Sequence, residues 1–195
     1  MRSQFLSMFD TFQTLESERL TLRAWTRHDA DALYDYASQP EVGPAAGWMP
    51  HSSKAQSLRF LEDVLLHNPL AWAILYKADN LVIGCINLRN DEKRSAARCY
   101  ALGFSMSKDY WGMGIMPEAS ALVIPYAFGP LRARLLSCYH YPHNIRSQRV
   151  IEKCGFTYEG RLRQCAQLDN GEVFDELCYS MTRHEYEHEY RKRHH

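Results

Sequence analysis

Two glycines in one short loop offer the clearest chemistry in the sequence. Gly112 and Gly114 lie in the segment YWGMGIMPEA at 110–119, between an apolar run and a helix-like pattern. Glycine adopts backbone conformations that other residues avoid, so successive N–H groups of this loop can point together into the space before the helix. Donors grouped in this way bind an anion, most naturally a phosphate. Taken alone, a Gly-x-Gly pair also fits a turn that merely ends a strand.

Hydrophobic periodicity predicts the elements around this loop. We expect a strand at 99–106 before it and a helix at 115–128 after it, because apolar residues recur there at strand and helix spacing. A strand at 134–140 and a helix at 144–154 follow. The loop is therefore predicted to join a strand to the amino end of a helix, where anions bind.

The other segments complete a mixed α/β fold. In chain order we expect a strand at 18–25, helices at 30–37 and from Ser52 or Ser53 to 65, strands at 70–76 and 81–88, and two strands that meet at 169–171. The Gly- and Pro-rich segment Gln39–His51 is predicted to be a loop. The predicted order is βααβββαβαββ, an α/β (α+β mixed) fold with a largely antiparallel central sheet flanked by helices and at least one crossover helix.

The composition is typical of one globular domain. The 195 residues are 46% hydrophobic and 24% charged, which argues against a disordered chain. Lys and Arg together number 23, as do Asp and Glu, so the net charge is zero and we expect neither nucleic acid nor a membrane as a partner. We place the domain at 15–182, with an N-terminal extension at 1–14 and a charged C-terminal tail at 183–195.

The N-terminal residues and the cysteines both favour a cytoplasmic protein. Residues 1–13 have no continuous apolar region and no small-residue cleavage site, so we expect no secretory signal. The longest apolar runs fall far short of the ~20 residues that span a bilayer. Six cysteines lie far apart without a Cys-x-x-Cys pair, which favours reduced thiols and no bound metal. Three disulfides or a zinc site would need a pairing or spacing that the sequence does not show.

Several motifs together resemble one known family. The glycine loop resembles the pyrophosphate-binding loop of the GNAT superfamily of N-acetyltransferases, and WGMGIMPEA is similar to its RimJ/RimL branch, which acetylates the N-termini of ribosomal proteins. Further matches follow in family order: GWMPH at 47–51, YPHNIRS at 141–147, EKCGF at 152–156, YEGRLR at 158–163 and NGEVFD at 170–175. The resemblance covers roughly residues 15–181 and implies a GNAT fold.

The resemblance implies acetyl-CoA as the acetyl donor. The residues implied in binding it are Phe104, Ser105 and Met106 beside the pantetheine arm, Asn144 hydrogen-bonded to that arm, and the backbone of Trp111, Gly112, Met113, Gly114 and Ile115 at the pyrophosphate. Ser147, one helical turn after Asn144, would stabilise the departing thiolate as a hydrogen-bond donor or general acid. Spacing alone indicates helix capping for this pair, and both roles can hold together.

The sequence departs from the family where a base is expected. Many relatives carry Glu at the position of Ala101, where it can accept the proton of the amine, and some carry a catalytic Glu at the position of Ala166. Asp109 replaces the Gln or Arg that usually opens the loop motif, which we expect a site of backbone donors to tolerate. The sequence therefore predicts no carboxylate at either base position.

His140 is the residue that we predict to replace the missing base. It lies in the cluster YHYPH at 139–143, at the end of a strand, and the ordinary pKa of histidine is close to neutral pH. A histidine in a strand is more often a packed residue than a base. A mechanism without a dedicated base is the alternative, because positioning supplies much of the acceleration.

Two further residues are predicted to line the acceptor cleft. Trp48 lies in the Gly- and Pro-rich loop, and Asp175 lies in a family-matching motif of the last hairpin. Variable loops on a rigid scaffold usually carry specificity. A hydrophobic lid over the core explains Trp48 equally well.

The predicted function is transfer of an acetyl group from acetyl-CoA to a primary amine by direct attack on the thioester. The resemblance favours the N-terminus of a protein or peptide as the acceptor. A small-molecule amine such as a polyamine, amino acid or aminoglycoside is the first alternative. Because both carboxylates are missing, a non-catalytic acyl-CoA-binding module is the second. The sequence leaves a homodimer open.

Overall fold

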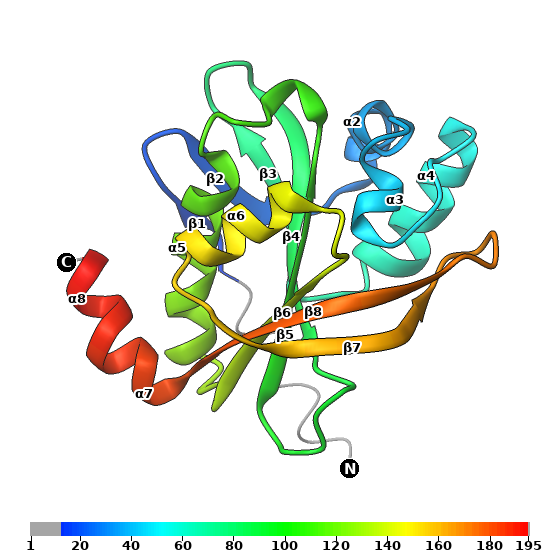
Figure 1. Cartoon of the computed structure of the whole chain (residues 1–195). Coiled ribbons are helices and arrows are strands. Elements are labelled where there is room, and N and C mark those ends of the chain that lie inside the picture. The colour runs from blue at the N-terminus through cyan, green and yellow to red at the C-terminus, as the bar shows by residue number, and fades with distance from the viewer. Residues whose placement is uncertain (1–12, 195) are drawn as a thin grey trace, which may run out of the picture.

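The computed structural model describes residues 13–194, so the extension expected at 1–14 lies almost wholly outside the described residues. The strands are β1 (Leu15–Glu16), β2 (Leu20–Ala24), β3 (Ala71–Tyr76), β4 (Leu81–Asn90), β5 (Cys99–Met106), β6 (Leu135–His140), β7 (Thr157–Gln167) and β8 (Val173–Thr182). The helices are α2 (Ala30–Ala37), α3 (Gly43–Ala46), α4 (Lys54–Phe60), α5 (Ile115–Phe128), α6 (Ile145–Lys153), α7 (Arg183–Glu185) and α8 (Arg191–His194) (Figure 1).

The strands form one mixed sheet in the order β1-β2-β3-β4-β5-β6-β8-β7. Neighbours run antiparallel except β5 and β6, which are parallel and are joined through α5. Parallel strands cannot be joined by a tight turn, so a crossover helix between them is required. The predicted fold, a largely antiparallel sheet flanked by helices, is confirmed.

The two parallel strands pair over only part of their length. Cys99–Leu102 of β5 pair with Leu135–Cys138 of β6, and the pairing ends there. From Gly103 to Met106, β5 is paired with β4 alone. The strands diverge beyond this point (Figure 1), which leaves the backbone of β5 with an open edge inside the sheet.

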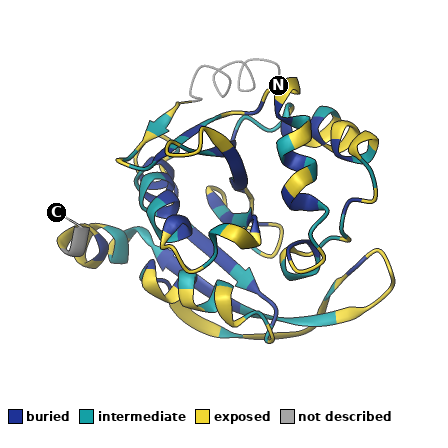
Figure 2. Cartoon of the chain, turned by 90° about the horizontal axis from the view of Figure 1, so that it is seen from above, coloured by how far each residue is buried: buried dark blue, intermediate teal, exposed yellow. Residues whose placement is uncertain are grey.

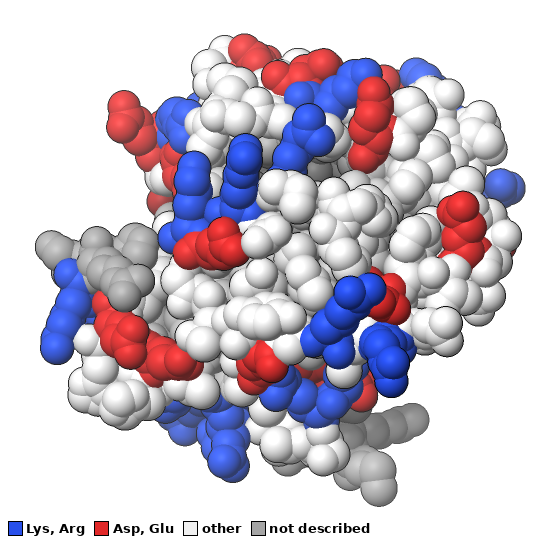
Figure 3. All heavy atoms as spheres, in the orientation of Figure 1, with Lys and Arg blue, Asp and Glu red and all other residues white. Residues whose placement is uncertain are grey.

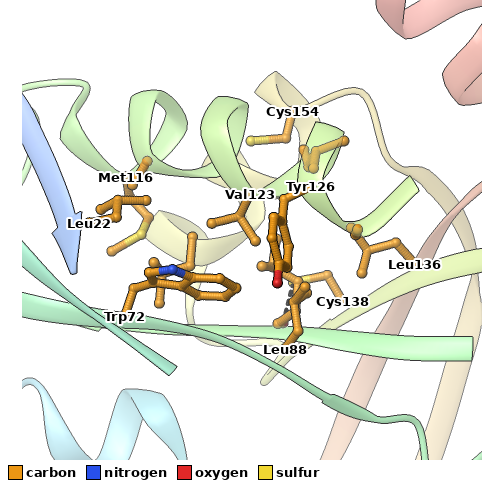
Figure 4. Packing of buried hydrophobic residues seen from close by; sticks show 14 of the residues in the cluster. Leu22, Trp72, Leu88, Met116, Val123, Tyr126, Leu136, Cys138 and Cys154 are labelled. Carbon is orange, nitrogen blue, oxygen red and sulfur yellow. Dashed lines mark hydrogen bonds between the residues drawn. The ribbon is translucent and has the colours of Figure 1, made fainter. Parts of the chain in front are cut away.

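Each face of the sheet packs against its own helices. Under α5, Trp72 is fully buried and meets Tyr126 edge-on, with ring centroids 5.3 Å apart (Figure 4). Under α2 and α4, a second cluster contains Trp25, Leu33 and Leu61. Figure 2 shows buried residues on the inward sides of these elements and exposed ones on their outer sides. Two separate clusters hold the helices on opposite faces, so the open edge of β5 lies between them.

One short helix occupies the segment that the sequence analysis treats as a loop. α3 begins with a proline in its first turn and ends at Gly47, whose φ is 96°. Proline fits the first turn of a helix because its missing N–H is not needed there. Four residues carry no apolar repeat, so periodicity could not predict this helix.

The segment 183–194, set apart above as a charged tail, is helical and packs on the domain. Tyr186 stacks on Phe128 with ring centroids 4.5 Å apart, and Tyr190 is 6% exposed. Arg183 donates a hydrogen bond to the carbonyl oxygen of Phe128 at 2.8 Å. These contacts fasten the segment to the carboxyl end of α5, while the boundary at 182 stays a prediction.

All six cysteines are free thiols, and five of them are buried. Burial raises the pKa of Cys138 to about 12, which leaves this thiol protonated at neutral pH. Among the described residues, no group of His, Cys, Asp and Glu side chains is arranged to hold a metal ion. Within the same part of the chain, no helix is long and apolar enough to cross a membrane.

Candidate active site

The glycine loop has the backbone geometry that anion binding needs. Gly112 and Gly114 adopt positive φ angles of 81° and 74°, a region that residues with a Cβ rarely enter. Within residues 13–194, no protein acceptor bonds the N–H groups from Gly112 to Met116. The N–H of Trp111, by contrast, donates to the carbonyl oxygen of Lys108 at 3.1 Å. The donors available to an anion therefore begin at Gly112 rather than at Trp111.

Arg19 braces this loop from outside. Its Nη1 donates to the carbonyl oxygen of Met113 at 3.0 Å, and its Nε donates to Glu118 Oε2 at 2.7 Å. Ser17 donates to the same carboxylate at 2.6 Å. Burial raises the pKa of Glu118, but the hydrogen bonds from Ser17 and Arg19 outweigh this effect and hold the pKa below its usual range. Arg19 is absent from the sequence-based site because its partners lie far along the chain.

A cavity of about 820 Å³ opens beside the loop, between β5, α3 and α6. Most residues predicted to hold the acetyl donor line it: Phe104, Ser105, Met106, Trp111, Gly112, Gly114, Ile115, Asn144 and Ser147. Met113 does not line it, and this residue is 44% exposed. The fold thus brings the open edge of β5, the glycine loop and the start of α6 to one space.

Asn144 caps α6 and also holds the Ser147 hydroxyl. Its Oδ1 accepts from the N–H of Ser147 at 3.0 Å, and its Nδ2 donates to Ser147 Oγ at 2.9 Å. The same Nδ2 donates to the carbonyl oxygen of Ala45 at 2.9 Å, which ties α3 to α6. Capping is therefore confirmed for Asn144, whereas the side chain of Ser147 has no capping role. Because Ser147 Oγ accepts from Asn144, its own hydrogen is left to donate toward the cavity.

One face of α6 adds positive charge to the rim of the cavity. Arg146, Arg149 and Lys153 line it, and none of the three forms an ion pair within the described residues. The Arg146 guanidinium lies 4.6 Å from the ring centroid of Trp111. Lys and Arg side chains gather on this side of the molecule (Figure 3). Their spacing of three and four residues was a usable signal of a shared helix face, which the sequence analysis missed.

Ala101, the position at which many relatives carry a catalytic Glu, is buried on the face of the sheet away from α5 and α6. Ala101 pairs with Ser137 and is 1% exposed. Tyr139, two residues further along β6, lies on the same face, and its hydroxyl donates to Asp91 at 2.7 Å. Burial raises the pKa of Tyr139 to about 12. Burial also raises the pKa of Asp91, but hydrogen bonds from Ser137 and Tyr139 outweigh it and keep the carboxyl ionised.

His140 lies on the opposite face of β6 from Ala101. Alternation along the strand places it with Cys138, where its ring packs against Tyr179 with centroids 5.5 Å apart. Its Nε2 is buried and has no hydrogen-bond partner among the described residues, and burial lowers its pKa. His140 does not line the cavity. Its position therefore speaks against the role of base that the sequence analysis assigns to it.

Trp48 and Asp175 also lie outside the cavity lining. Trp48 packs against His51, with ring centroids 5.3 Å apart, at the edge of the cluster under α2 and α4. Asp175 accepts from Arg161 Nε at 2.6 Å and from the N–H of Gln164 at 2.7 Å. These bonds brace the β7–β8 hairpin. An acceptor-binding role for either residue stays a prediction.

The sequence matches a known protein family over most of its length. The family described as the Acetyltransferase (GNAT) domain matches residues 19–157. The chain therefore belongs to the GNAT acetyltransferases. Within that class it is of the RimJ/RimL type, an N-acetyltransferase that uses acetyl-CoA.

Individual relatives agree with this assignment. The chain is 28% identical over 179 residues to the uncharacterized N-acetyltransferase p20 of Bacillus licheniformis, covering 89% of this chain and 98% of that protein. It is 30% identical over 101 residues to the ribosomal protein uS5-alanine N-acetyltransferase of Escherichia coli (strain K12), covering 52% and 51% of the two chains. The microcin C7 self immunity acetyltransferase MccE, solved in complex with acetyl-CoA and AMP, shares the fold with a TM-score of 0.72 at 23% identity, covering 85% and 93%.

Proposed function

We propose that this enzyme acetylates the free N-terminal amine of a protein or peptide by direct attack of the amine on the thioester. One observation carries the proposal: a single cavity joins the unbonded N–H groups that begin at Gly112, the open edge of β5 and the Ser147 hydroxyl. The N–H groups suit a pyrophosphate, the open edge of β5 suits an extended polar arm, and the Ser147 hydroxyl suits a leaving sulfur. The acceptor then enters from the opposite face of the sheet.

The donor side supplies binding through fixed groups. The N–H groups from Gly112 to Met116 face the pyrophosphate at the amino end of α5, where the helix dipole favours negative charge. Arg146, Arg149 and Lys153 add charge for the remaining phosphate. The open edge of β5 offers backbone groups that an extended pantetheine arm can pair with as an added strand would.

The transfer step needs one new bond and one broken bond. The neutral amine forms a bond to the thioester carbonyl carbon, the carbon–sulfur bond breaks, and the nitrogen gives its remaining extra proton to the departing thiolate, which leaves as the thiol. Ser147, held by Asn144, donates its hydroxyl hydrogen toward the sulfur and stabilises the thiolate. Because Ala101 offers no carboxylate, the amine loses its proton to water before the attack, and positioning supplies the acceleration.

The choice of acceptor rests on a relative. The Escherichia coli enzyme is named for an alanine of ribosomal protein uS5, and the similarity to it covers 52% of this chain. A backbone N-terminus presents its amine at the end of an extended chain.

The proposal is tested by thiol release from acetyl-CoA across a panel of amines. The panel holds peptides that begin with alanine or serine, spermidine, free alanine and kanamycin. Each peptide has a matched control with the same sequence and a blocked N-terminus. We expect the highest kcat/KM with a free peptide N-terminus and none with the blocked peptide. A higher kcat/KM with any of the small amines would overturn the proposed acceptor.

A further inference from the structure

Lys93 places an ammonium group on the acceptor face of the sheet. It lies in the loop between β4 and β5, and its Nζ forms an ion pair with Glu176. The same Nζ lies 4.2 Å from the ring centroid of Tyr139. A carboxylate together with an aromatic face is a combination that binds ammonium groups. The chain's own lysine shows that this pair accepts a cation.

The pair stands beside the opening between β5 and β6. Tyr139 is the first residue of β6 beyond its pairing with β5. Tyr139 pairs with Cys178 of β8, and Glu176 lies two residues before Cys178 in β8, on the same face. Ala101 and Ser105 share that face of β5, and Ser105 lines the cavity. A cation bound between Tyr139 and Glu176 is therefore on the side of the opening from which an acceptor must approach.

We propose that Glu176 and Tyr139 form the binding site for the ammonium group of the acceptor, and that Lys93 fills this site until the acceptor displaces it. The proposal rests on the proposed function and names the part of the protein that recognises the amine. Displacement exchanges one ammonium for another, so the charge balance of the site does not change. The bound amine then gives its proton to water and reacts as the neutral form.

Lys93 is freer to move than Glu176, as the proposal requires. Glu176 projects from a strand in the sheet and its side chain is 15% exposed, whereas the Lys93 side chain projects from a loop and is 33% exposed. Lysine has a flexible stem of four carbons and a strongly hydrated ammonium group. Lys93 can therefore move into solvent while Glu176 and Tyr139 stay in place.

A simpler interpretation is that the ion pair fastens the loop between β4 and β5. That loop is already fastened by Asp91, which accepts from the N–H of Lys93 at 3.0 Å and from the hydroxyl of Tyr139 at 2.7 Å. Arg94 adds ion pairs to Asp91 and Glu159. Removing only the Lys93 ammonium leaves all of these contacts, so a Lys93 variant is expected to fold.

Two substitutions with opposite expected effects test the proposal, using a peptide with N-terminal alanine as acceptor. A site whose occupant must be displaced binds more weakly, so Lys93→Met should lower the KM for the peptide by about threefold to tenfold. Glu176→Gln removes the carboxylate and should raise that KM by about tenfold. The KM for acetyl-CoA should not change in either variant. Lys54→Met, which removes an exposed ion pair with Asp31 on the α2 and α4 side, is the matched control and should change neither value.

A loop anchor predicts that both substitutions raise the KM for the peptide, or that both leave it unchanged, and either result would overturn the proposal. A second measurement does not depend on turnover. In an NMR titration with propylammonium, Lys93→Met should bind more tightly than the unmodified protein and Glu176→Gln more weakly. If no peptide is acetylated but this order holds, the proposed acceptor is wrong and the ammonium site stands. Equal affinities for all three proteins would reject the site.

Discussion

Different kinds of chemical group line the two faces of the opening between β5 and β6. The face toward α5 and α6 consists of backbone N–H groups, an N-cap and cations on one helix face. The face toward α2 and α4 consists of side chains from separate segments, among them Asp91, Tyr139 and Glu176. Backbone donors follow from local residue types, whereas these side-chain contacts depend on strand register. Donor binding is therefore expected to depend on local sequence, and the proposed acceptor recognition on tertiary contacts.

The largest effect is expected where a side chain enters the backbone site. Gly114→Val should weaken CoA binding by about 1,000-fold, because two or more charge-assisted hydrogen bonds are lost. A Cβ at this position would meet only Arg19 Nη2, at 3.8 Å, but the φ of 74° disfavours any L side chain. Isothermal titration calorimetry of the folded variant gives the affinity.

A matched glycine separates strain from loss of the site. Gly171 lies in the β7–β8 turn and also has a positive φ, 88°, and a Cβ added there would meet no atom within 4 Å. Gly171→Val should cost similar stability and leave the CoA affinity unchanged. Equal CoA affinity in Gly114→Val and Gly171→Val would show that the loop does not bind the donor.

The next effect concerns the leaving group. Ser147→Ala should lower kcat by about 100-fold, as the loss of a general acid typically does, with little change in CoA affinity. Because Asn144 is the N-cap, the unfolding free energy should change by less than about 0.5 kcal/mol. Asn144→Ala is the contrasting variant, which loses the cap and should lower stability by about 1 kcal/mol. An unchanged kcat in Ser147→Ala would remove this serine from the mechanism.

The division between backbone groups set by local sequence and side-chain contacts set by strand register also explains what could be predicted from the sequence. Apolar periodicity and glycine spacing predicted β5, the loop and α5, and the residues named there line the cavity, with Met113 as the exception. The role of base predicted for His140 stays a prediction, although strand alternation places its ring on the face of β6 away from the proposed acceptor side. Arg19, Lys93 and Glu176 were missed because their contacts join segments far apart in the chain, and no local pattern records such register.

A smaller effect is expected from the cations at the rim. Arg146→Gln should weaken CoA binding by about fivefold, since one exposed cation facing a phosphate contributes modestly and is screened by salt. The loss should shrink as ionic strength rises. Arg27→Gln, which removes an exposed ion pair with Glu62, is the control and should leave CoA affinity unchanged. A loss from Arg146→Gln as large as that from Gly114→Val would mean that side chains, not backbone donors, dominate on this face.

The smallest effect on rate is expected at His140. His140→Gln should leave the pH dependence of kcat/KM unchanged, with a log-linear rise toward the pKa of the amine in both proteins, because this imidazole lies on the far face of β6. If kcat/KM of the unmodified protein falls below a pKa between about 6 and 7, and this fall is absent in His140→Gln, then His140 is the base.

The substitution should nevertheless change how stability depends on pH. Burial lowers the pKa of His140 below its ordinary value of 6.5. Between the folded-state pKa and 6.5, the unfolded chain binds one proton more than the folded chain. The unfolding free energy contributed by His140 is therefore fully present above 6.5 and is lost as the pH falls through this window, by at most about 1.4 kcal/mol per pH unit. Gln does not titrate, so His140→Gln should flatten the acid limb of the stability curve and leave the rate profile intact. His51, whose pKa burial also lowers, contributes part of the slope that remains, and carboxyl groups with lowered pKa values, such as Asp29 and Asp91, contribute at lower pH.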